Sequence, residues 1–232
     1  SFFSSMVGYM VLLLFLIFVG LFMWVFTSTS ILDYNFATMD QLFAIAPLIF
    51  IFLIPAVTMR SFSEEKQSGT IEFLLTKPLT DLQLLLGKYF ASLTLVIFAI
   101  IPTLIYYYSI YQLGSPVGNI DSGAVIGSYI GLIFLAASFV AIGIFCSTLT
   151  DNQIIAFLIA VFLCFTVHFT FDYLSELPVF FGKWDDTVQK IGFQYHYGSI
   201  SKGKIDSRDV IYFISVIGLF LWLSWTSLQK HK

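Results

Sequence analysis

Long apolar runs separated by short polar segments dominate this sequence. An α-helix needs ~20 predominantly apolar residues to cross the hydrocarbon core of a bilayer, and six of the runs are long enough. We therefore expect an all-α integral membrane protein with six transmembrane helices. The expected spans lie at about residues 6–26, 42–59, 82–108, 123–149, 153–173 and 209–228.

The composition agrees with a membrane protein. Hydrophobic residues make up 58% of the chain and charged residues only 11%, whereas soluble domains contain about 25% charged residues. No basic tract indicates nucleic-acid binding. Cys146 and Cys164 both lie inside apolar runs, so we expect them to pack as small hydrophobic side chains rather than as a disulfide or a metal pair.

One polar segment, residues 60–88, separates the second and third spans and carries eight charged residues. Within it Gly69 permits a tight turn. Four apolar residues follow and offer a face to a partner: Ile71, Phe73, Leu74 and Leu75. Residues 80–83 have the form of a capping box, which predicts the start of the third span. The segment is interpreted as a folded docking insert, with an amphipathic interfacial helix as the alternative.

The loop charges predict the orientation. The loops at residues 27–41 and 112–122 contain no Lys or Arg, which is typical of extracytoplasmic loops. Residues 60–81 and both termini then lie in the cytoplasm, and residues 174–208 form a long extracytoplasmic loop. The total numbers of Lys and Arg favour this orientation only slightly, because the long loop carries five of them. Short re-entrant helices are compatible with its length.

Three glycines in the fourth predicted span recur every four residues: Gly123, Gly127 and Gly131. They share one helix face, and small residues at this spacing let helix backbones approach closely in lipid. We expect this face to pack tightly against another helix. The partner helix lies either in the same subunit or across a dimer seam.

An ionisable pair, His168 and Asp172, lies near the end of the fifth predicted span. The two residues are four apart and share one helix face. Ionisable residues at membrane depth indicate a proton relay or an ion site. The alternative is that they pair with each other or reach the headgroups near the interface.

Catalytic and nucleotide-binding motifs are missing from the sequence. Gly87 and Lys88 lack the upstream glycine and the following hydroxyl residue of a P-loop. There is no H-E-x-x-H, paired C-x-x-C or G-x-S-x-G motif. We therefore predict no catalytic, cofactor-binding or metal-binding residues in this chain.

Residues 64–78 read Glu-Glu-Lys-Gln-Ser-Gly-Thr-Ile-Glu-Phe-Leu-Leu-Thr-Lys-Pro. This stretch resembles the E-E-x-x-x-G-T-x-E-x-L-L-T-x-P stretch of ABC-2 type transporter permeases, and residues 55–60 and 86–89 fit the same pattern. More narrowly, these residues and residues 201–213 resemble the gliding-motility-associated ABC permease subunit of Bacteroidetes. The resemblance covers nearly the whole chain.

The resemblance implies one ABC-2 type transmembrane domain, residues 1–232, in a multi-pass subunit of the bacterial inner membrane. Its first cytoplasmic loop, residues 60–81, is then a coupling element that contacts a separate ABC ATPase subunit. ATP and Mg would be bound by that ATPase. The implied coupling residues are Glu64, Glu65, Gly69, Thr70, Glu72, Leu74, Leu75 and Pro78. A second permease copy, or a different permease or accessory subunit, and membrane lipid are the other expected partners.

Two other classes of function stay open on the residues alone. An ion-coupled secondary transporter would use His168 and Asp172, and it predicts internal repeats and interrupted helices at matched positions. No such repeat is visible in the sequence. An intramembrane enzyme needs a nucleophile–base pair or metal ligands on facing helices, and His168 alone supplies neither.

Overall fold

The computed structural model describes residues 6–26, 30–34, 36–70, 80–177, 182 and 184–229. Every regular element in these ranges is helical, which confirms the predicted all-α class. In chain order the elements are α1 (Met6–Trp24), α2 (Ile31–Tyr34), α3 (Asp40–Thr58), α4 (Arg60–Gln67), α6 (Asp81–Ile100), the 3₁₀ turn η2 (Ile101–Thr103), α7 (Leu104–Leu113), α8 (Ser122–Leu149), α9 (Gln153–Phe165), the π-helical turn η3 (Thr166–Thr170), α10 (Phe171–Ser175), α11 (Asp185–Gln189), α12 (Phe193–Ile200) and α13 (Ser207–Gln229).

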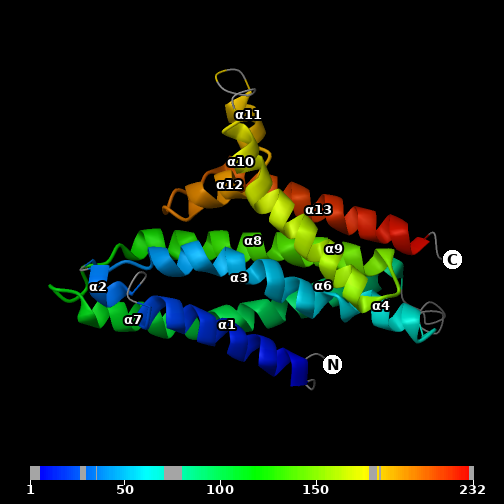
Figure 1. The fold of residues 1–232 in the computed structure, drawn as a ribbon, viewed down its shortest axis with the longest axis horizontal. Helices are drawn as coiled ribbons and strands as arrows, with labels where there is room; N and C mark the ends of the chain where they lie inside the picture. The colour runs from blue at the N-terminus through cyan, green and yellow to red at the C-terminus, as the bar shows by residue number, and fades with distance from the viewer. Residues whose placement is uncertain are drawn as a thin grey trace.

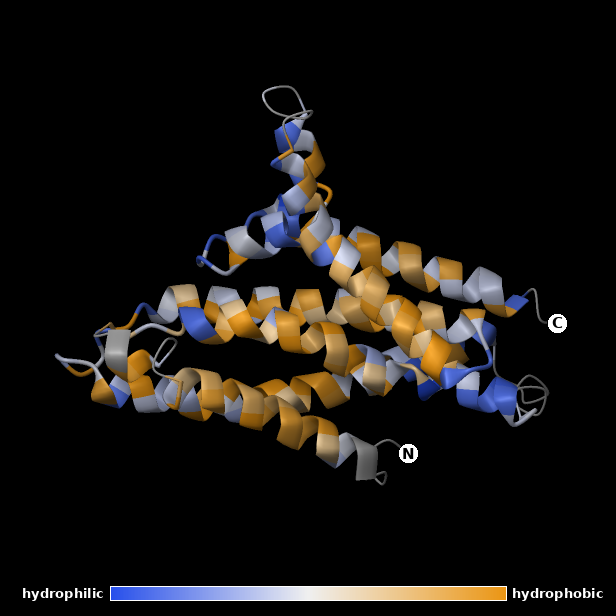
Figure 2. Cartoon of the chain, in the orientation of Figure 1, coloured by the Kyte–Doolittle hydropathy of each residue, from blue (hydrophilic) through white to orange (hydrophobic). Residues whose placement is uncertain are grey.

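Five helical stretches are long and apolar enough to cross a membrane. They are Asp40–Gln67, Asp81–Leu113, Ser122–Leu149, Gln153–Ser175 and Ser207–Gln229. The apolar helix Gly8–Trp24, within α1, is shorter than these five, so the sixth crossing stays a prediction. Figure 2 shows hydrophobic residues along the helices of the bundle and hydrophilic residues gathered at α4 and around α11.

The long helices form a bundle with α8 at its centre. α8 packs against α3, α13, α9, α6, α4 and α12, whereas α13 buries little of its surface. The α8 sequence is rich in Gly, Ala and Ser, which allows neighbouring helices to approach on several sides. α4, the start of α1 and the end of α13 lie toward one end of the long axis, and α2 and α7 lie at the other end (Figure 1).

Most of the spans are interrupted, each at a definable place. The stretch α6–α7 is broken by η2, which contains Pro102, a residue that cannot continue the helical hydrogen bonds. α3 continues through Pro47 and Pro55 and ends at a turn at Met59, where α4 begins. The stretch α9–α10 is interrupted by the π-helical turn η3.

Local capping signals position the helix starts. The predicted capping box at Thr80 is confirmed: its Oγ1 accepts from the Gln83 N–H at 3.3 Å, and the Thr80 N–H donates to Gln83 Oε1 at 3.1 Å. The side chains of Asp121 and Asn152 accept from the first-turn N–H groups of α8 and α9. Such caps satisfy N–H groups that have no partner within the helix.

The segment between α10 and α13 contains two short helices, of which α12 folds back onto the bundle. α12 packs against α8 and α13. Its Tyr197 hydroxyl donates to the Phe43 carbonyl of α3 at 2.7 Å. α11 packs against α10, and the two helices lie in a projection from the bundle (Figure 1).

Candidate functional site

The α4 helix is held against the end of α8 by one hydroxyl group. Ser147 Oγ accepts from the N–H groups of Phe62 at 2.8 Å and Ser63 at 3.1 Å, and donates to the Met59 carbonyl at 3.1 Å. First-turn N–H groups commonly lack partners within their own helix. Met59, at the N-cap of α4, makes no side-chain cap. Ser147 therefore supplies the missing cap from 85 residues away in the sequence.

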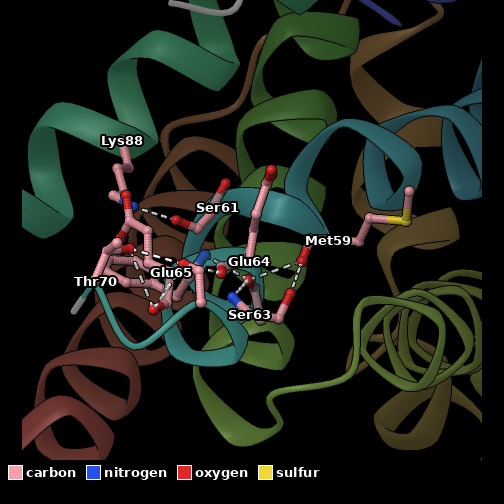
Figure 3. A network of polar contacts seen from close by, with 10 residues as sticks. Met59, Ser61, Ser63, Glu64, Glu65, Thr70 and Lys88 are labelled. Carbon is pink, nitrogen blue, oxygen red and sulfur yellow. Dashed lines mark hydrogen bonds and ion pairs between the residues drawn. The ribbon is translucent and has the colours of Figure 1, made fainter.

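An ion pair joins α4 to α6. Lys88 of α6 pairs with Glu65 and also donates to the Ser61 carbonyl, and its ammonium lies 4.3 Å from the centroid of the Phe62 ring (Figure 3). Only 15% of the Lys88 side chain and 26% of the Glu65 side chain are exposed. The carboxylate of Glu65 thus faces α6, inside the protein.

The last turn of α4 is also tied to α8. Lys66 Nζ donates to the Thr148 carbonyl at 2.6 Å and lies 4.0 Å from Asp151 Oδ1. A cation at a helix C-terminus is favourable because the last carbonyls carry partial negative charge. Ser227 of α13 donates to the same Thr148 carbonyl at 3.2 Å. The end of α8 therefore joins α4 and α13.

A close approach of α3 and α8 completes this junction. A Cβ atom at Gly143 would lie 2.0 Å from Thr58 Oγ1 and 2.9 Å from Thr58 Cβ, so only glycine fits there. Thr58 is fully buried, and its hydroxyl donates back to the Ile54 carbonyl at 2.9 Å. Gly143 lies outside the predicted glycine face, and its role has no signal in the sequence besides being a glycine in an apolar run.

The outward side of this junction presents polar residues. Glu64, Gln67 and Ser68 are exposed, as are Gly69 and Thr70. Gly69 has a φ of +69°, which is the left-handed conformation expected of a tight turn, and the Ser68 and Thr70 hydroxyls lie 2.9 Å apart. Four of the predicted coupling residues lie outside the described residues: Glu72, Leu74, Leu75 and Pro78.

The predicted glycine face of α8 packs within the subunit at two of its three positions. A Cβ at Gly127 would lie 3.0 Å from Gly203 Cα, and a Cβ at Gly131 would lie 2.7 Å from Ile200 Cγ2. Both contacts are with α12 and the turn after it. At Gly123 the nearest such atom is the cap carboxylate of Asp121.

His168 and Asp172 have different partners. Asp172 Oδ1 accepts from Gln189 Nε2 at 2.8 Å, whereas His168 is buried beside the rings of Phe139 and Phe169. In the part of the chain that the structure describes, His168 Nδ1 has no hydrogen-bond partner. The π-helical turn η3 contains His168 and changes the register of the helix before Asp172.

A second histidine, which the sequence reasoning missed, forms a buried polar network. The Nδ1 atom of His196 lies 2.7 Å from Asp209 Oδ1, and its Nε2 lies 2.9 Å from the Lys190 carbonyl. Because a carbonyl only accepts, Nε2 carries a proton. The ring stacks on Tyr212 at a centroid distance of 3.9 Å. His196 and Asp209 are 13 residues apart, a spacing without a motif.

The class of this protein follows from its match to a known family. The family model described as ABC-2 family transporter protein matches residues 29–184, which is more than half of the chain. The chain belongs to the ABC-2 transporter family. A search of curated proteins found no match.

Family membership and the apolar helices together establish a multi-pass membrane protein. As an ABC-2 permease, the chain is a transmembrane subunit of an ABC transporter rather than its catalytic subunit, and its family works with an ABC ATPase. The matched range contains α4, its junction with α6 and α8, and the His168 region.

Proposed function

We propose that this ABC-2 permease couples ATP hydrolysis by a separate ABC ATPase to transport or mechanical work, through α4 and the segment that follows it to residue 81. The observation that carries the proposal is the attachment of α4. Ser147 and Lys88 fix its inner side to α8 and α6, while Glu64 and Gln67 face outward. A helix fixed in this way transmits a push from a docked partner to the membrane helices.

The charges of this surface indicate how the ATPase is recognised. Glu64 is exposed, so the surface offers a carboxylate to basic residues of the ATPase, and in this proposal Glu72 of the following segment supplies a second. Complementary charges of this kind set orientation and association rate more than raw affinity. Glu65 acts on the inner side, through Lys88. ATP and Mg are bound by the ATPase, and this chain contributes no cofactor ligand.

The wider setting is part of the same proposal. The chain crosses a bacterial inner membrane six times, with residues 60–81 in the cytoplasm and residues 174–208 outside. It works beside a second permease copy or a different permease or accessory subunit. The likeness of residues 201–213 to the gliding-motility permease supports a link to surface motility.

The geometry does not favour ion-coupled transport through His168 and Asp172. An ion site or relay requires both side chains to face one ligand or each other. Asp172 is instead held by Gln189, and His168 lies among aromatic rings.

The experiment is affinity co-purification of the tagged permease from native membranes, followed by an ATPase assay. In Glu64→Arg the exposed carboxylate is reversed, and we expect the apparent affinity for the ATPase to fall about tenfold, equivalent to ~1.4 kcal/mol. Glu176→Arg is the matched control, because Glu176 is exposed but follows α10, away from α4. Equal ATPase recovery with both variants, or no ATPase with the wild type, would contradict the proposal.

A further inference from the structure

α8 is a continuous helix from Ser122 to Leu149, 28 residues long. At 1.5 Å per residue it extends about 42 Å. The other helices beside α4 contain proline or are broken: α3 contains Pro47 and Pro55, α6 ends at η2, and α9 ends at η3. α8 contains no proline and has no such break, so among these helices it is the uninterrupted connection between the two ends of the bundle.

One end of α8 holds α4. Ser147 caps α4, and the Thr148 carbonyl accepts a hydrogen bond from Lys66. Thr58, in the last turn of α3, packs against Gly143. All three contacts lie in the last two turns of α8. A displacement of α4 must therefore displace this end of α8 or break these contacts.

The other end of α8 holds the turn after α12. Ser128 Oγ donates to the Ser201 carbonyl at 2.7 Å. Gly203 has a φ of +78°, and a Cβ on it would lie 2.7 Å from Ala124 Cα. Together with the Gly127 and Gly131 contacts described above, these approaches bring the backbone of the turn into direct contact with α8.

The α12 segment is itself a junction of three helices. Tyr197 bonds to the Phe43 carbonyl of α3, and His196 bonds to Asp209 at the start of α13. Phe193 packs on Phe139 of α8 with ring centroids 5.7 Å apart. A translation of α8 along its axis, or a rotation about it, would therefore disturb the contacts of α12 with α8, α3 and α13 together.

We propose that α8 is the rigid lever that carries movement of α4 to the α12 segment, residues 193–206, at the far end of the bundle. This inference rests on the proposed coupling of α4 to an ATPase. It adds the route inside the permease and the element that moves. Packed interfaces of this kind switch between discrete arrangements rather than deforming continuously.

The test measures the accessibility of the far end while the nucleotide state of the ATPase is changed. Lys202→Cys places a thiol on the exposed turn after α12. The native Cys146 and Cys164 are buried, so a charged maleimide reports on position 202. The intact complex, isolated from native membranes, is labelled with ADP or with ATP and vanadate. We expect the labelling rate to differ at least about fivefold between the two states, the low end of ordinary coupling between sites.

Two variants in this background break the lever at its two ends. Ser147→Ala removes the cap of α4, and Gly131→Val forces Ile200 away from α8. We expect each variant to abolish most of the nucleotide-dependent difference in the labelling rate at position 202 while the ATPase stays bound. Ser138→Ala is the control for the first, since the Ser138 hydroxyl bonds only within α8, to the Phe134 carbonyl. Gly218→Val is the control for the second, because no described atom lies within 4 Å of a Cβ built there.

The outcomes separate the two proposals. A nucleotide-dependent rate that is lost in Ser147→Ala and Gly131→Val, but kept in both controls, supports the lever. If the complex hydrolyses ATP but position 202 labels equally in both states, or if both variants keep the difference, the lever is wrong and the coupling of α4 stands. Failure of the ATPase to bind in the Lys202→Cys background overturns both. Should Gly131→Val not fold, Ser128→Ala takes its place, which removes the bond to the Ser201 carbonyl and a second bond, within α8, to the Ala124 carbonyl.

Discussion

Among single residues, Lys88 has the most connected position near α4. It pairs with Glu65, donates to the Ser61 carbonyl and lies over the Phe62 ring. Both charged side chains are mostly buried. Removing one partner of such a pair leaves the other charge uncompensated in a poorly hydrated site, which costs more than the pair itself contributes.

We therefore expect Lys88→Met to destabilise the protein by about 3 kcal/mol, and Lys88→Met with Glu65→Gln to recover most of this loss. The measurement is thermal unfolding of the purified protein in nanodiscs. The control is Lys190→Met, because Lys190, the C-cap residue of α11, forms an exposed pair with Asp186 four residues earlier. Exposed pairs contribute about 0.5 kcal/mol or less. A double variant less stable than Lys88→Met would argue against the ion pair.

At the scale of elements, the docking of α4 depends on a cap from another helix. Ser147 accepts from two first-turn N–H groups, those of Phe62 and Ser63. A buried N–H without an acceptor costs about 1–3 kcal/mol. This applies to Phe62, whereas Ser63 is the fourth residue of α4, the first position at which the N–H can bond within the helix. The contacts of α4 through Lys66 and Lys88 engage two side chains and the Ser61 carbonyl, and none of them supplies an acceptor for these N–H groups.

Ser147→Ala should thus loosen the start of α4 without unfolding the bundle. Hydrogen exchange of peptides covering residues 60–68 is expected to accelerate at least about tenfold, since ~1.4 kcal/mol of lost opening free energy corresponds to that factor. Peptides from the middle of α8 should keep their protection. Ser138→Ala should leave both regions unchanged. Equal exchange in Ser147→Ala and wild type would show that the cap does not hold α4.

The elements that the sequence predicts well are those with local signals. The capping box at Thr80 depends on neighbours three residues apart, and the apolar runs identify the long helices directly. The π-helical turn η3 has no such signal. The i, i+4 spacing of His168 and Asp172 therefore predicted a shared helix face that the change of register at η3 alters. Other contacts join segments that are distant in the sequence: Ser147 with α4, Gly143 with Thr58, and Glu65 with Lys88. The periodicity of apolar residues does not predict such contacts.

At the scale of the whole molecule, the bundle separates two polar ends. α4 lies at one end, and the α7–α8 loop with its exposed Asn119 lies at the other (Figure 1). The loops without Lys or Arg predict that the first end lies in the cytoplasm. This assignment determines which end an ATPase can reach.

The orientation is tested with a membrane-impermeant maleimide on intact spheroplasts. Asn119→Cys is expected to be labelled from outside, and Gln67→Cys only after the membrane is permeabilised, because both positions are exposed but at opposite ends. The unmodified protein, with its buried Cys146 and Cys164, gives the background. Labelling of Gln67→Cys alone in intact spheroplasts would invert the topology and remove α4 from the cytoplasm.

The long-range cap of α4 also orders events during synthesis. Phe62 leaves the ribosome 85 residues before Ser147, a delay of several seconds or more at ordinary elongation rates. During that time α4 has neither its cap nor the Lys66 acceptor at Thr148. The docked form of α4 is thus completed only after the helix containing Ser147 has been made. An ATPase that recognises docked α4 would bind completed permeases but not nascent ones. The complex would then assemble only from completed chains.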